Sequence, residues 1–274
     1  MAERPLVSIV IAAYNERAHI ARCLSSLQQQ RYEPLEVIVV DDGSRDRTVD
    51  IARSFDGVQV VQTAHRGAAA ARNEGARRAH GEIYVFLDAD MTFPPPFVDR
   101  LVAPLLADPA EVGTFTREIL VANTDRRWAR AHQLGRGLPL DTHFKPGFPD
   151  RWEIFRSIRA SAFWSVGGFD EVGHGEDVTL GRKLGTLAVV APGAACHHYE
   201  PEDLRDIFRS ARWLGRGERV REKPNALRDH NPVRALRRGI RLARQHRRPS
   251  LLLYRLVWDS GVAIGLLQGR SVVK

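Results

Sequence analysis

Cysteine and long apolar runs are scarce in this sequence. Only two of the 274 residues are cysteines, Cys23 and Cys196, which excludes a disulfide scaffold and a four-cysteine zinc site and fits a reducing compartment. No run of about eighteen apolar residues is free of charge, so we expect no ordinary membrane-spanning helix. The short apolar run at residues 6–13 lacks a convincing cleavage site, and we interpret it as a buried strand and not a signal peptide.

Glycine-rich phosphate loops are also missing. Neither G-x-x-x-x-G-K-[ST] nor G-x-G-x-x-G occurs in the chain, so any bound nucleotide must be held by a metal ion and carboxylates. Hydrophobic residues make up 43% of the chain and charged residues 27%. This composition suffices for a sizeable core and excludes a disordered polymer.

The positive charge is confined to one segment. The formal net charge is +8, but residues 201–248 hold fifteen Lys and Arg against six Asp and Glu. The rest of the chain is therefore close to neutral. The basic character belongs to a C-terminal region and not to the core chemistry.

Apolar, β-branched runs alternate with helical segments over the first ninety residues. The runs lie at residues 7–12, 36–40, 58–61 and 83–87. Between them, helical spacing places Ile20, Leu24 and Leu27 on one face, and residues 67–79 are rich in alanine. This alternation predicts an α/β fold with a Rossmann-like, mostly parallel sheet flanked by helices.

The pattern is looser beyond residue 90. We expect helices at about residues 94–106 and 127–134, strands at 113–119 and 187–191, and an irregular loop at 135–150. A short helix and turn at 161–170 lead to Gly175, which precedes one more predicted helix.

Polar residues follow three of the apolar runs. The first run leads into Tyr14 and Glu16, the second into Asp41 and Asp42, and the fourth into Asp88 and Asp90. Parallel strands share one edge at their carboxyl ends, where ligands bind, and close carboxylates repel each other unless a cation or donors offset them. Asp88-x-Asp90 therefore predicts a site for Mg²⁺ or Mn²⁺, which accept oxygen ligands. The structural alternative is a solvated or helix-capping acidic turn.

Two acids, Glu176 and Asp177, open the helix predicted after Gly175. The helix dipole favours acids at this position, so capping alone explains one of them. Alternatively, a carboxylate placed opposite the metal acts as general base on a hydroxyl nucleophile.

Four ordered motifs resemble glycosyltransferase family 2. They are AAYNE at 12–16, VVDDGSRDRT at 39–48, RGAAAARNEGARRAHGEIYVFLDAD at 66–90, and GGFDE with GEDVTLGRKL between 167 and 184. The resemblance covers about residues 5–200. It implies the GT-A fold and a metal-dependent, inverting transfer of a sugar from a UDP- or GDP-sugar to an acceptor hydroxyl.

The resemblance also implies roles for single residues. Donor contacts fall on Ala13, Tyr14, Glu16, Asp42, Arg72, Asp88 and Ala89. Asp88 and Asp90 match the family's D-x-D pair, with Asp90 as the direct ligand of Mn²⁺ or Mg²⁺. Asp177 matches the catalytic base, and Glu176 is its neighbour on the acceptor side. A metal-binding histidine of some related enzymes matches His197 or His198, of which we favour His198; the alternative is a structural histidine.

The same reasoning predicts the domain order. Residues 1–200 form the GT-A catalytic domain, with a nucleotide-binding half at 1–110 and an acceptor-binding half at 111–200, and residues 201–274 form a basic, amphipathic helical extension. Residues 209–213 (RSARW) lack the leading Gln of the processive members' Q-x-x-R-W motif, so we expect transfer of one sugar.

The apolar stretch 251–268 contains Arg255 and Asp259. Charges at mid-span are costly in hydrocarbon, so we expect this stretch to lie at a membrane surface and not to cross it. With the arginines of residues 234–248, it predicts a cytoplasmic enzyme held peripherally on the anionic inner face of the cell membrane, near a lipid-linked acceptor. Alternatively, the stretch packs on the catalytic domain or in a homodimer.

Two other functions remain open. A nucleotidyltransferase that makes nucleotide sugars would need a glycine-rich, basic loop after the first strand, where this chain has AAYNERA. A non-enzymatic nucleic-acid-binding module would use the basic segment, but that segment lacks an aromatic-rich platform, so we expect no nucleic-acid partner.

Overall fold

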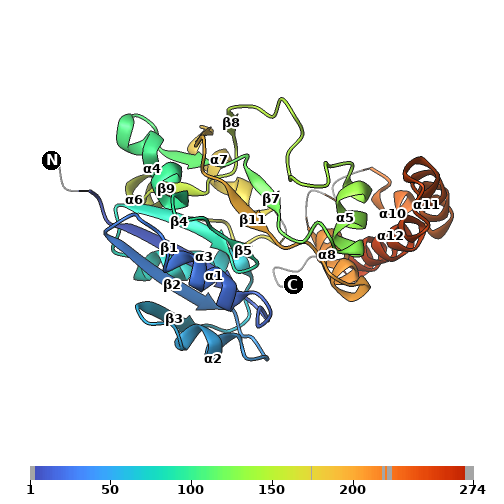
Figure 1. The fold of residues 1–274 in the computed structure, drawn as a ribbon, viewed down its shortest axis with the longest axis horizontal. Coiled ribbons are helices and arrows are strands. Elements are labelled where there is room, and N and C mark those ends of the chain that lie inside the picture. The colour runs from blue at the N-terminus through green and yellow to red at the C-terminus, as the bar shows by residue number, and fades with distance from the viewer. Residues whose placement is uncertain (1–3, 174, 218–219, 221–223, 269–274) are drawn as a thin grey trace. The chain divides into compact units, whose positions relative to one another are not determined.

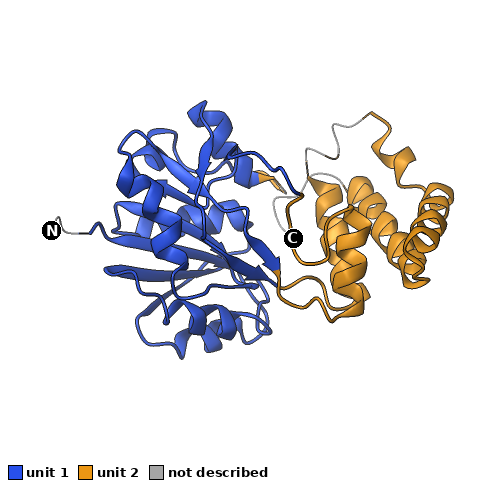
Figure 2. Ribbon diagram, turned by 45° about the horizontal axis from the view of Figure 1, so that its top comes forward, with its two compact units in different colours: residues 1–120, 146–171, 176–198 blue, residues 121–145, 172–175, 199–274 orange. Residues whose placement is uncertain are grey.

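The chain divides into two compact units. The computed structural model describes residues 4–173, 175–217, 220 and 224–268. Unit 1 comprises residues 1–120, 146–171 and 176–198, and unit 2 comprises residues 121–145, 172–175 and 199–274 (Figure 2).

An eight-stranded sheet forms the centre of unit 1, with helices around it (Figure 1). Its strand order is β3-β2-β1-β4-β9-β6-β10-β8. The strands are β1 (Val7–Ala13), β2 (Leu35–Asp41), β3 (Val58–Gln62), β4 (Ile83–Asp88), β6 (Gly113–Phe115), β8 (Arg151–Trp152), β9 (Ser157–Arg159) and β10 (Ala188–Val190). Strands β1 to β4 are parallel neighbours, β9 runs antiparallel to β4 and β6, and β8 runs antiparallel to β10. The predicted mostly parallel α/β sheet is confirmed.

The helices of unit 1 cover this sheet. They are α1 (Ile20–Leu27), α2 (Thr48–Arg53), α3 (Ala68–Arg78), α4 (Phe97–Ala107), α6 (Ala160–Ser165) and α7 (Thr179–Leu184), with a 3-10 turn η1 (Glu176–Val178) before α7. Helix α3 approaches β1 and β2 closely, because a Cβ on Gly75 would overlap Val10. Phe163 of α6 packs with Phe86 of β4 in the same core cluster.

Three short strands form a second sheet, in the order β5 (Met91–Thr92), β11 (Cys196–His198) and β7 (Ile119–Val121). The sequence predicts one strand over residues 113–119, but the chain turns after β6, where the Thr116 hydroxyl accepts a hydrogen bond from the Glu118 amide at 3.0 Å. β6 and β7 therefore belong to different sheets. The pairing of His198 with Met91 in this second sheet brings β11 to the end of β4.

Unit 2 is helical. Its helices are α5 (Arg127–Arg136), α8 (Leu204–Arg216), α10 (Ala226–Asp229), α11 (Pro232–His246) and α12 (Ser250–Gln268). Asp203 caps α8 by accepting hydrogen bonds from the amides of Arg205 and Asp206 at 2.7 and 2.8 Å. Asn231 caps α11, which begins with Pro232, a residue suited to the first helical position.

Helix α12 is the central helix of unit 2, and it packs against α8, α11 and α5. The crossing with α8 needs glycine at three positions, because a Cβ on Gly215, Gly261 or Gly265 would overlap backbone atoms of the facing helix. By length and composition alone α12 could cross a membrane. Of its most apolar 18-residue stretch, 33% is buried. In the structure this stretch packs within unit 2, and its predicted position at a membrane surface stays a prediction.

Residues 121–145 belong to unit 2, although the sequence predicts them in the acceptor half of the catalytic domain. The physical reason is the apolar face of α5. Ala131 of α5 lies in one buried cluster with Leu251 and Tyr254 of α12, and Trp128 and Leu134 pack against the same cluster.

Candidate active site

The polar ends of three strands meet at one edge of the large sheet. The register pairs Ala13 of β1 with Asp41 of β2, and Ala12 of β1 with Asp88 of β4. Ala13 and Ala89 are buried, so the polar residues that follow them in the chain form the more exposed part of this edge. The predicted clustering of Tyr14, the Asp41–Asp42 pair and the D-x-D pair at this edge follows from the parallel register.

An aromatic stack lies beside the end of β2. The rings of Tyr14 and His65 are 3.9 Å apart at their centroids and only 11° from parallel. Asp42 holds the histidine, with 2.7 Å between His65 Nδ1 and a carboxylate oxygen. The sequence did not single out His65, which follows β3 by three residues.

The two acids at the end of β2 differ in their partners. Asp42 accepts hydrogen bonds from the amides of Arg66 and Gly67 at 2.8 and 2.9 Å, in addition to its contact with His65, so its carboxylate holds the loop that enters α3. Asp41 Oδ2 accepts from the Ser44 amide at 3.1 Å. Among the described residues the buried Asp41 Oδ1 has no hydrogen-bond partner. Of this pair, Asp41 thus has the carboxylate oxygen that no described donor engages.

The loops after β1 and β2 brace each other. The Asn15 amide donates to Ser44 Oγ at 2.8 Å, and the Asn15 side-chain oxygen accepts from the Arg45 amide at 2.9 Å. The Glu16 amide donates to Thr48 Oγ1 at 2.8 Å. Asn15 has a φ of 57°, a left-handed conformation that Asn tolerates better than most residues. These bonds fix the segment that carries Tyr14 and Glu16.

Two arginines bind Asp88. Arg72 Nη2 donates to one carboxylate oxygen at 2.8 Å, and Arg156 Nη1 donates to the other at 2.9 Å. Burial alone would raise the pKa of Asp88, but the guanidinium groups of Arg156 and Arg72 outweigh it and hold this pKa well below its usual range. Asp88 is therefore an anion whose two oxygens are already engaged by protein donors.

Asp90 faces the histidine of the neighbouring sheet. His198 Nε2 lies 3.4 Å from Asp90 Oδ2, and both side chains are partly exposed. Successive residues of a strand point to opposite faces, so His197 is directed away from the face that His198 shares with Asp90. Of the two candidate histidines, the structure brings His198 to the D-x-D segment.

The acid pair of η1 joins the same network. Arg72 Nη1 donates to Glu176 Oε1 at 2.6 Å, and Glu176 is buried, whereas Asp177 is half-buried. Burial would lower the pKa of Arg72, but the carboxylates around it, led by Glu176 and Asp88, raise this pKa above its ordinary value. Asp177 contributes to the same rise. The sequence predicts that these acids open a regular helix; they form a 3-10 turn instead, and α7 begins at Thr179.

The segment before η1 is tied to α3. The Asn73 side chain donates to the Phe169 carbonyl and accepts from the Phe169 amide, both at 2.9 Å. Arg66 binds Glu171 through its Nη2, at 2.9 and 2.7 Å from the two carboxylate oxygens. These contacts hold the GGFDE motif against the helix that carries Arg72.

Arg156 is a further site residue that the sequence did not single out. It precedes the short strand β9, and its backbone is held by hydrogen bonds to Phe86 and Thr114 on the neighbouring strands. No motif surrounds it. Only the pairing of β9 with β4 brings its guanidinium to Asp88.

Comparison with known proteins agrees with this geometry. The model of glycosyl transferase family 2 matches residues 8–167, which is more than half of the chain. The chain belongs to glycosyltransferase family 2. The validoxylamine A glucosyltransferase of Streptomyces hygroscopicus subsp. jinggangensis is 31% identical over 217 residues, covering 66% of this chain and 51% of that protein. The probable glycosyltransferase YdaM of Bacillus subtilis is 31% identical over 241 residues, covering 78% of this family 2 chain and 55% of YdaM.

This family 2 chain spans about half the length of those two relatives. The putative glycosyltransferase EpsH of Bacillus subtilis is 35% identical over 104 residues, which cover 36% of this chain and 30% of EpsH.

Solved structures share the fold of this chain. The mannosyltransferase PcManGT of Pyrobaculum calidifontis, in complex with GDP-Man and Mn²⁺, superposes with a TM-score of 0.60 at 23% identity, covering 97% of this chain and 87% of that one. TarS 1-349 of S. aureus, in complex with UDP-GlcNAc, superposes with a TM-score of 0.57 at 17% identity. The match covers 96% of this chain and 90% of that one. The GT-A fold is thereby confirmed.

Proposed function

We propose that the chain transfers one sugar from a nucleotide-diphosphate sugar to an acceptor hydroxyl, with inversion at the anomeric carbon. The observation that carries this proposal is the chain of hydrogen bonds from Glu176 through Arg72 to Asp88. It joins the acid pair of η1 to the end of β4, beside Asp90. The proposed base follows Glu176 in the chain and the proposed metal ligand Asp90 follows Asp88 by two residues, so both adjoin this network.

The nucleoside is proposed to bind at the ends of β1 and β2. Tyr14 and His65 offer flat ring faces for a base, and Asp41 Oδ1 offers an acceptor for a base N–H. We assign this role to Asp41 in place of Asp42, whose carboxylate already holds the loop at residues 65–67. GDP-Man and UDP-GlcNAc in the structural neighbours support a nucleotide-sugar donor.

Asp90 and His198 are the side chains proposed to hold a divalent cation. A carboxylate and an imidazole whose ligand atoms lie 3.4 Å apart can share one ion, and this mixed set suits Mn²⁺ as well as Mg²⁺. A cation bound there would offset the charge that develops on the departing nucleoside diphosphate. Asp88 instead holds Arg72 and Arg156 at the same edge, where their positive charge can face the diphosphate.

Asp177 is proposed to accept the proton of the attacking hydroxyl. It is half-buried, whereas Glu176 is buried and accepts a hydrogen bond from Arg72. Direct attack by the deprotonated acceptor displaces the nucleoside diphosphate in one step, which inverts the anomeric centre and needs no covalent intermediate on the protein. The acceptor is proposed to be lipid-linked, at the inner face of the cell membrane, because the basic residues concentrate in unit 2.

Donor turnover by the full chain tests this function. The protein is incubated with UDP- and GDP-sugars and Mn²⁺ or Mg²⁺, release of the nucleoside diphosphate is measured, and NMR assigns the anomer of the product. We expect release with one nucleotide and loss of at least several kcal/mol of transition-state stabilisation in Asp90→Ala, with an unchanged melting temperature. Full activity in EDTA, or wild-type rates for Asp90→Ala, would contradict the metal assignment. No release with any donor would contradict the transfer itself.

A further inference from the structure

Helix α11 presents an outward face of aliphatic side chains and arginines. Three aliphatic side chains are exposed, Val233 by 60%, Leu236 by 43% and Ile240 by 37%. Arginines stand between them along the helix. At 100° per residue, the six residues fall within an arc of roughly 140°. We call this the arginine–aliphatic face, and it consists of Val233, Leu236, Arg237, Ile240, Arg241 and Arg244.

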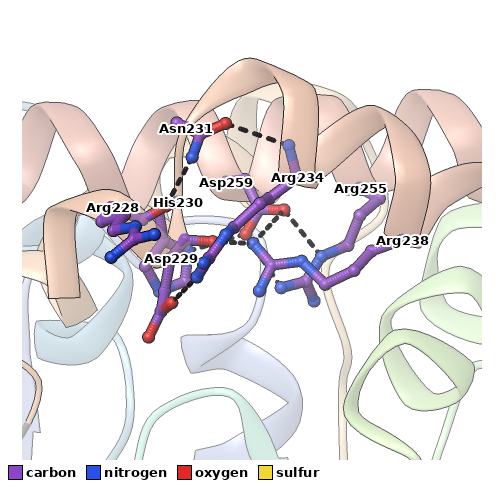
Figure 3. Close-up of polar contacts among 8 residues, drawn as sticks. All are labelled: Arg228, Asp229, His230, Asn231, Arg234, Arg238, Arg255 and Asp259. Atoms are coloured by element: carbon purple, nitrogen blue, oxygen red, sulfur yellow. Dashed lines mark hydrogen bonds and ion pairs between the residues drawn. The ribbon is translucent and has the colours of Figure 1, made fainter. Parts of the chain in front are cut away.

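The opposite side of α11 is buried within unit 2. Ala235 and Gly239 are buried, and a Cβ on Gly239 would overlap Leu252 of α12. Arg238 donates to Asp259 of α12 at 3.1 Å (Figure 3). The inward side of α11 is therefore already used for packing.

The buried Asp259 locks this arrangement. Besides the bond from Arg238, it accepts from Arg255 Nε and Nη2, each at 2.8 Å, and it lies 2.7 Å from His230 Nδ1 (Figure 3). Arg234 is also engaged, through an ion pair with Asp229, the last residue of α10. The bond from Arg238 to Asp259 and the close approach of Gly239 to Leu252 turn one side of α11 toward α12, so the arginine–aliphatic face is turned outward.

The outward arginines differ from the inward ones in having no anion of their own. Within the part of the chain that the structure describes, Arg237, Arg241 and Arg244 form no ion pair. Residues 232–248 contain seven arginines and no Asp or Glu. The face therefore carries uncompensated positive charge next to exposed aliphatic groups.

We propose that the arginine–aliphatic face of α11 binds the surface of an anionic lipid bilayer. Guanidinium groups bind phosphate oxygens, and aliphatic side chains between them enter the boundary of the acyl chains, so both kinds of side chain gain by the same contact. A nucleic acid would use the arginines but leave three aliphatic side chains in water, and the face has no aromatic ring on which a base could stack. The inference deepens the proposed membrane location and rests on it.

Vesicle co-sedimentation of the full chain tests the proposal. Vesicles of phosphatidylcholine alone are compared with vesicles that also contain phosphatidylglycerol. The charge variant is R237Q/R241Q/R244Q, the apolar variant is L236S/I240S, and the matched control is R53Q/R77Q/R78Q, which removes three exposed arginines from unit 1. All substituted residues are partly or fully exposed, and circular dichroism verifies the fold of each variant.

We expect wild type and control to bind the anionic vesicles and not the neutral ones. The charge variant should bind about 100-fold more weakly, since each basic residue at an anionic surface contributes roughly a factor of five. The apolar variant should bind more weakly than wild type and lose the fraction that resists high salt. Wild-type binding by either variant would overturn the proposal. Equal binding to neutral and anionic vesicles would also overturn it. A third contrary result would be that the chain binds no vesicles but binds an RNA oligonucleotide, with the same affinity in L236S/I240S as in wild type.

Donor hydrolysis without vesicles separates this inference from the transferase assignment. None of the variants changes a residue of the candidate active site, so each should release nucleoside diphosphate at the wild-type rate. Vesicle binding without donor turnover would contradict the proposed transfer but still support the arginine–aliphatic face as a membrane-binding surface. Donor turnover without vesicle binding would contradict the membrane surface and leave the transferase.

Discussion

Asp88 in unit 1 and Asp259 in unit 2 are each held by two arginines, and they differ in what lies on their open side. Asp88 ends strand β4 with a side chain that is 33% exposed, between Arg72 and Arg156. Its neighbours along the edge are the other acids of the candidate site. Its two arginines lie at the same edge and are less exposed than Asp88 itself.

Asp259 lies in the middle of a helix, and its side chain is only 1% exposed. Arg255 comes from its own helix, Arg238 from α11, and His230 follows α10 directly. Burial alone would raise the pKa of Asp259, but the hydrogen bond from His230 and the charges of Arg255 and Arg238 lower it below its ordinary value. This carboxylate joins three segments of the chain and is closed to solvent.

The contrast shows that an aspartate between arginines is not by itself a functional signal. Both carboxylates have a lowered pKa, so the shift does not distinguish them. What differs is the place in the fold. A strand end opens to solvent together with its neighbours, whereas a helix interior is enclosed on all sides. Asp88 should therefore matter for turnover, and Asp259 for stability.

The largest expected effect concerns Asp177, the proposed base near the Asp88 network. Asp177→Asn keeps the shape of the side chain and removes its basicity, so transfer should fall by roughly 10²–10⁴ while nucleotide affinity and melting temperature stay unchanged. Steady-state turnover measures the transfer, calorimetric titration measures the nucleotide affinity, and thermal unfolding measures the melting temperature. Glu176→Gln can still accept the hydrogen bond from Arg72 and should retain more activity; the reverse order would assign the base to Glu176.

The next effect tests the two aspartates directly. Asp259→Asn leaves two partly buried arginines without their anion and should lower the free energy of unfolding by about 3 kcal/mol, with turnover per folded molecule unchanged. Asp88→Asn should reduce turnover and change the stability less, because that site is open to water. Urea denaturation and donor turnover of both variants provide the comparison. Equal losses of stability would remove the contrast.

A smaller effect separates the acids at the end of β2. Asp41→Asn should weaken nucleotide binding by about 10- to 100-fold, since a hydrogen bond to a charged group is worth about 1.5–3 kcal/mol. Asp42→Asn should mainly lower the melting temperature, because Asp42 holds residues 65–67. Calorimetric titration and thermal unfolding distinguish the two variants. Unchanged affinity in Asp41→Asn would return the contact to Asp42.

The smallest effect is the pH dependence of the Asp259 contribution. Because the pKa of Asp259 is lower in the folded chain, its stabilisation is complete above the pKa of the unfolded state, near 4, and is lost as the pH falls toward the folded value. The difference in unfolding free energy between wild type and Asp259→Asn should therefore be constant near neutral pH and shrink in acid. A difference that grows in acid would contradict the lowered pKa.

Local patterns were sufficient for the α/β class and for the expectation that the polar strand ends share one edge of the sheet. The alternation of apolar runs and helical segments predicts β1 to β4, and the parallel register brings Tyr14, Asp41 and Asp88 to one edge. His65 and Arg156 escaped prediction because no motif contains them. The resemblance implies Asp42 as the nucleoside contact, whereas our proposal assigns that contact to Asp41, because the carboxylate of Asp42 binds a loop more than twenty residues away in the chain.

Sequence by itself determined which residue types are available at the strand ends and that the C-terminal region is basic. The tertiary structure decided how each charge is used. From the sequence, Asp259 is a charge in an apolar stretch, which would be costly to place in hydrocarbon. In unit 2 it is instead the buried partner of Arg238 and Arg255. Likewise, of seven neighbouring arginines with the same local pattern, Arg238 points inward to an acid and Arg241 outward to solvent. Periodicity records which residues share a face, but the partner of a charge comes from a distant segment, and only the packed fold brings the two together.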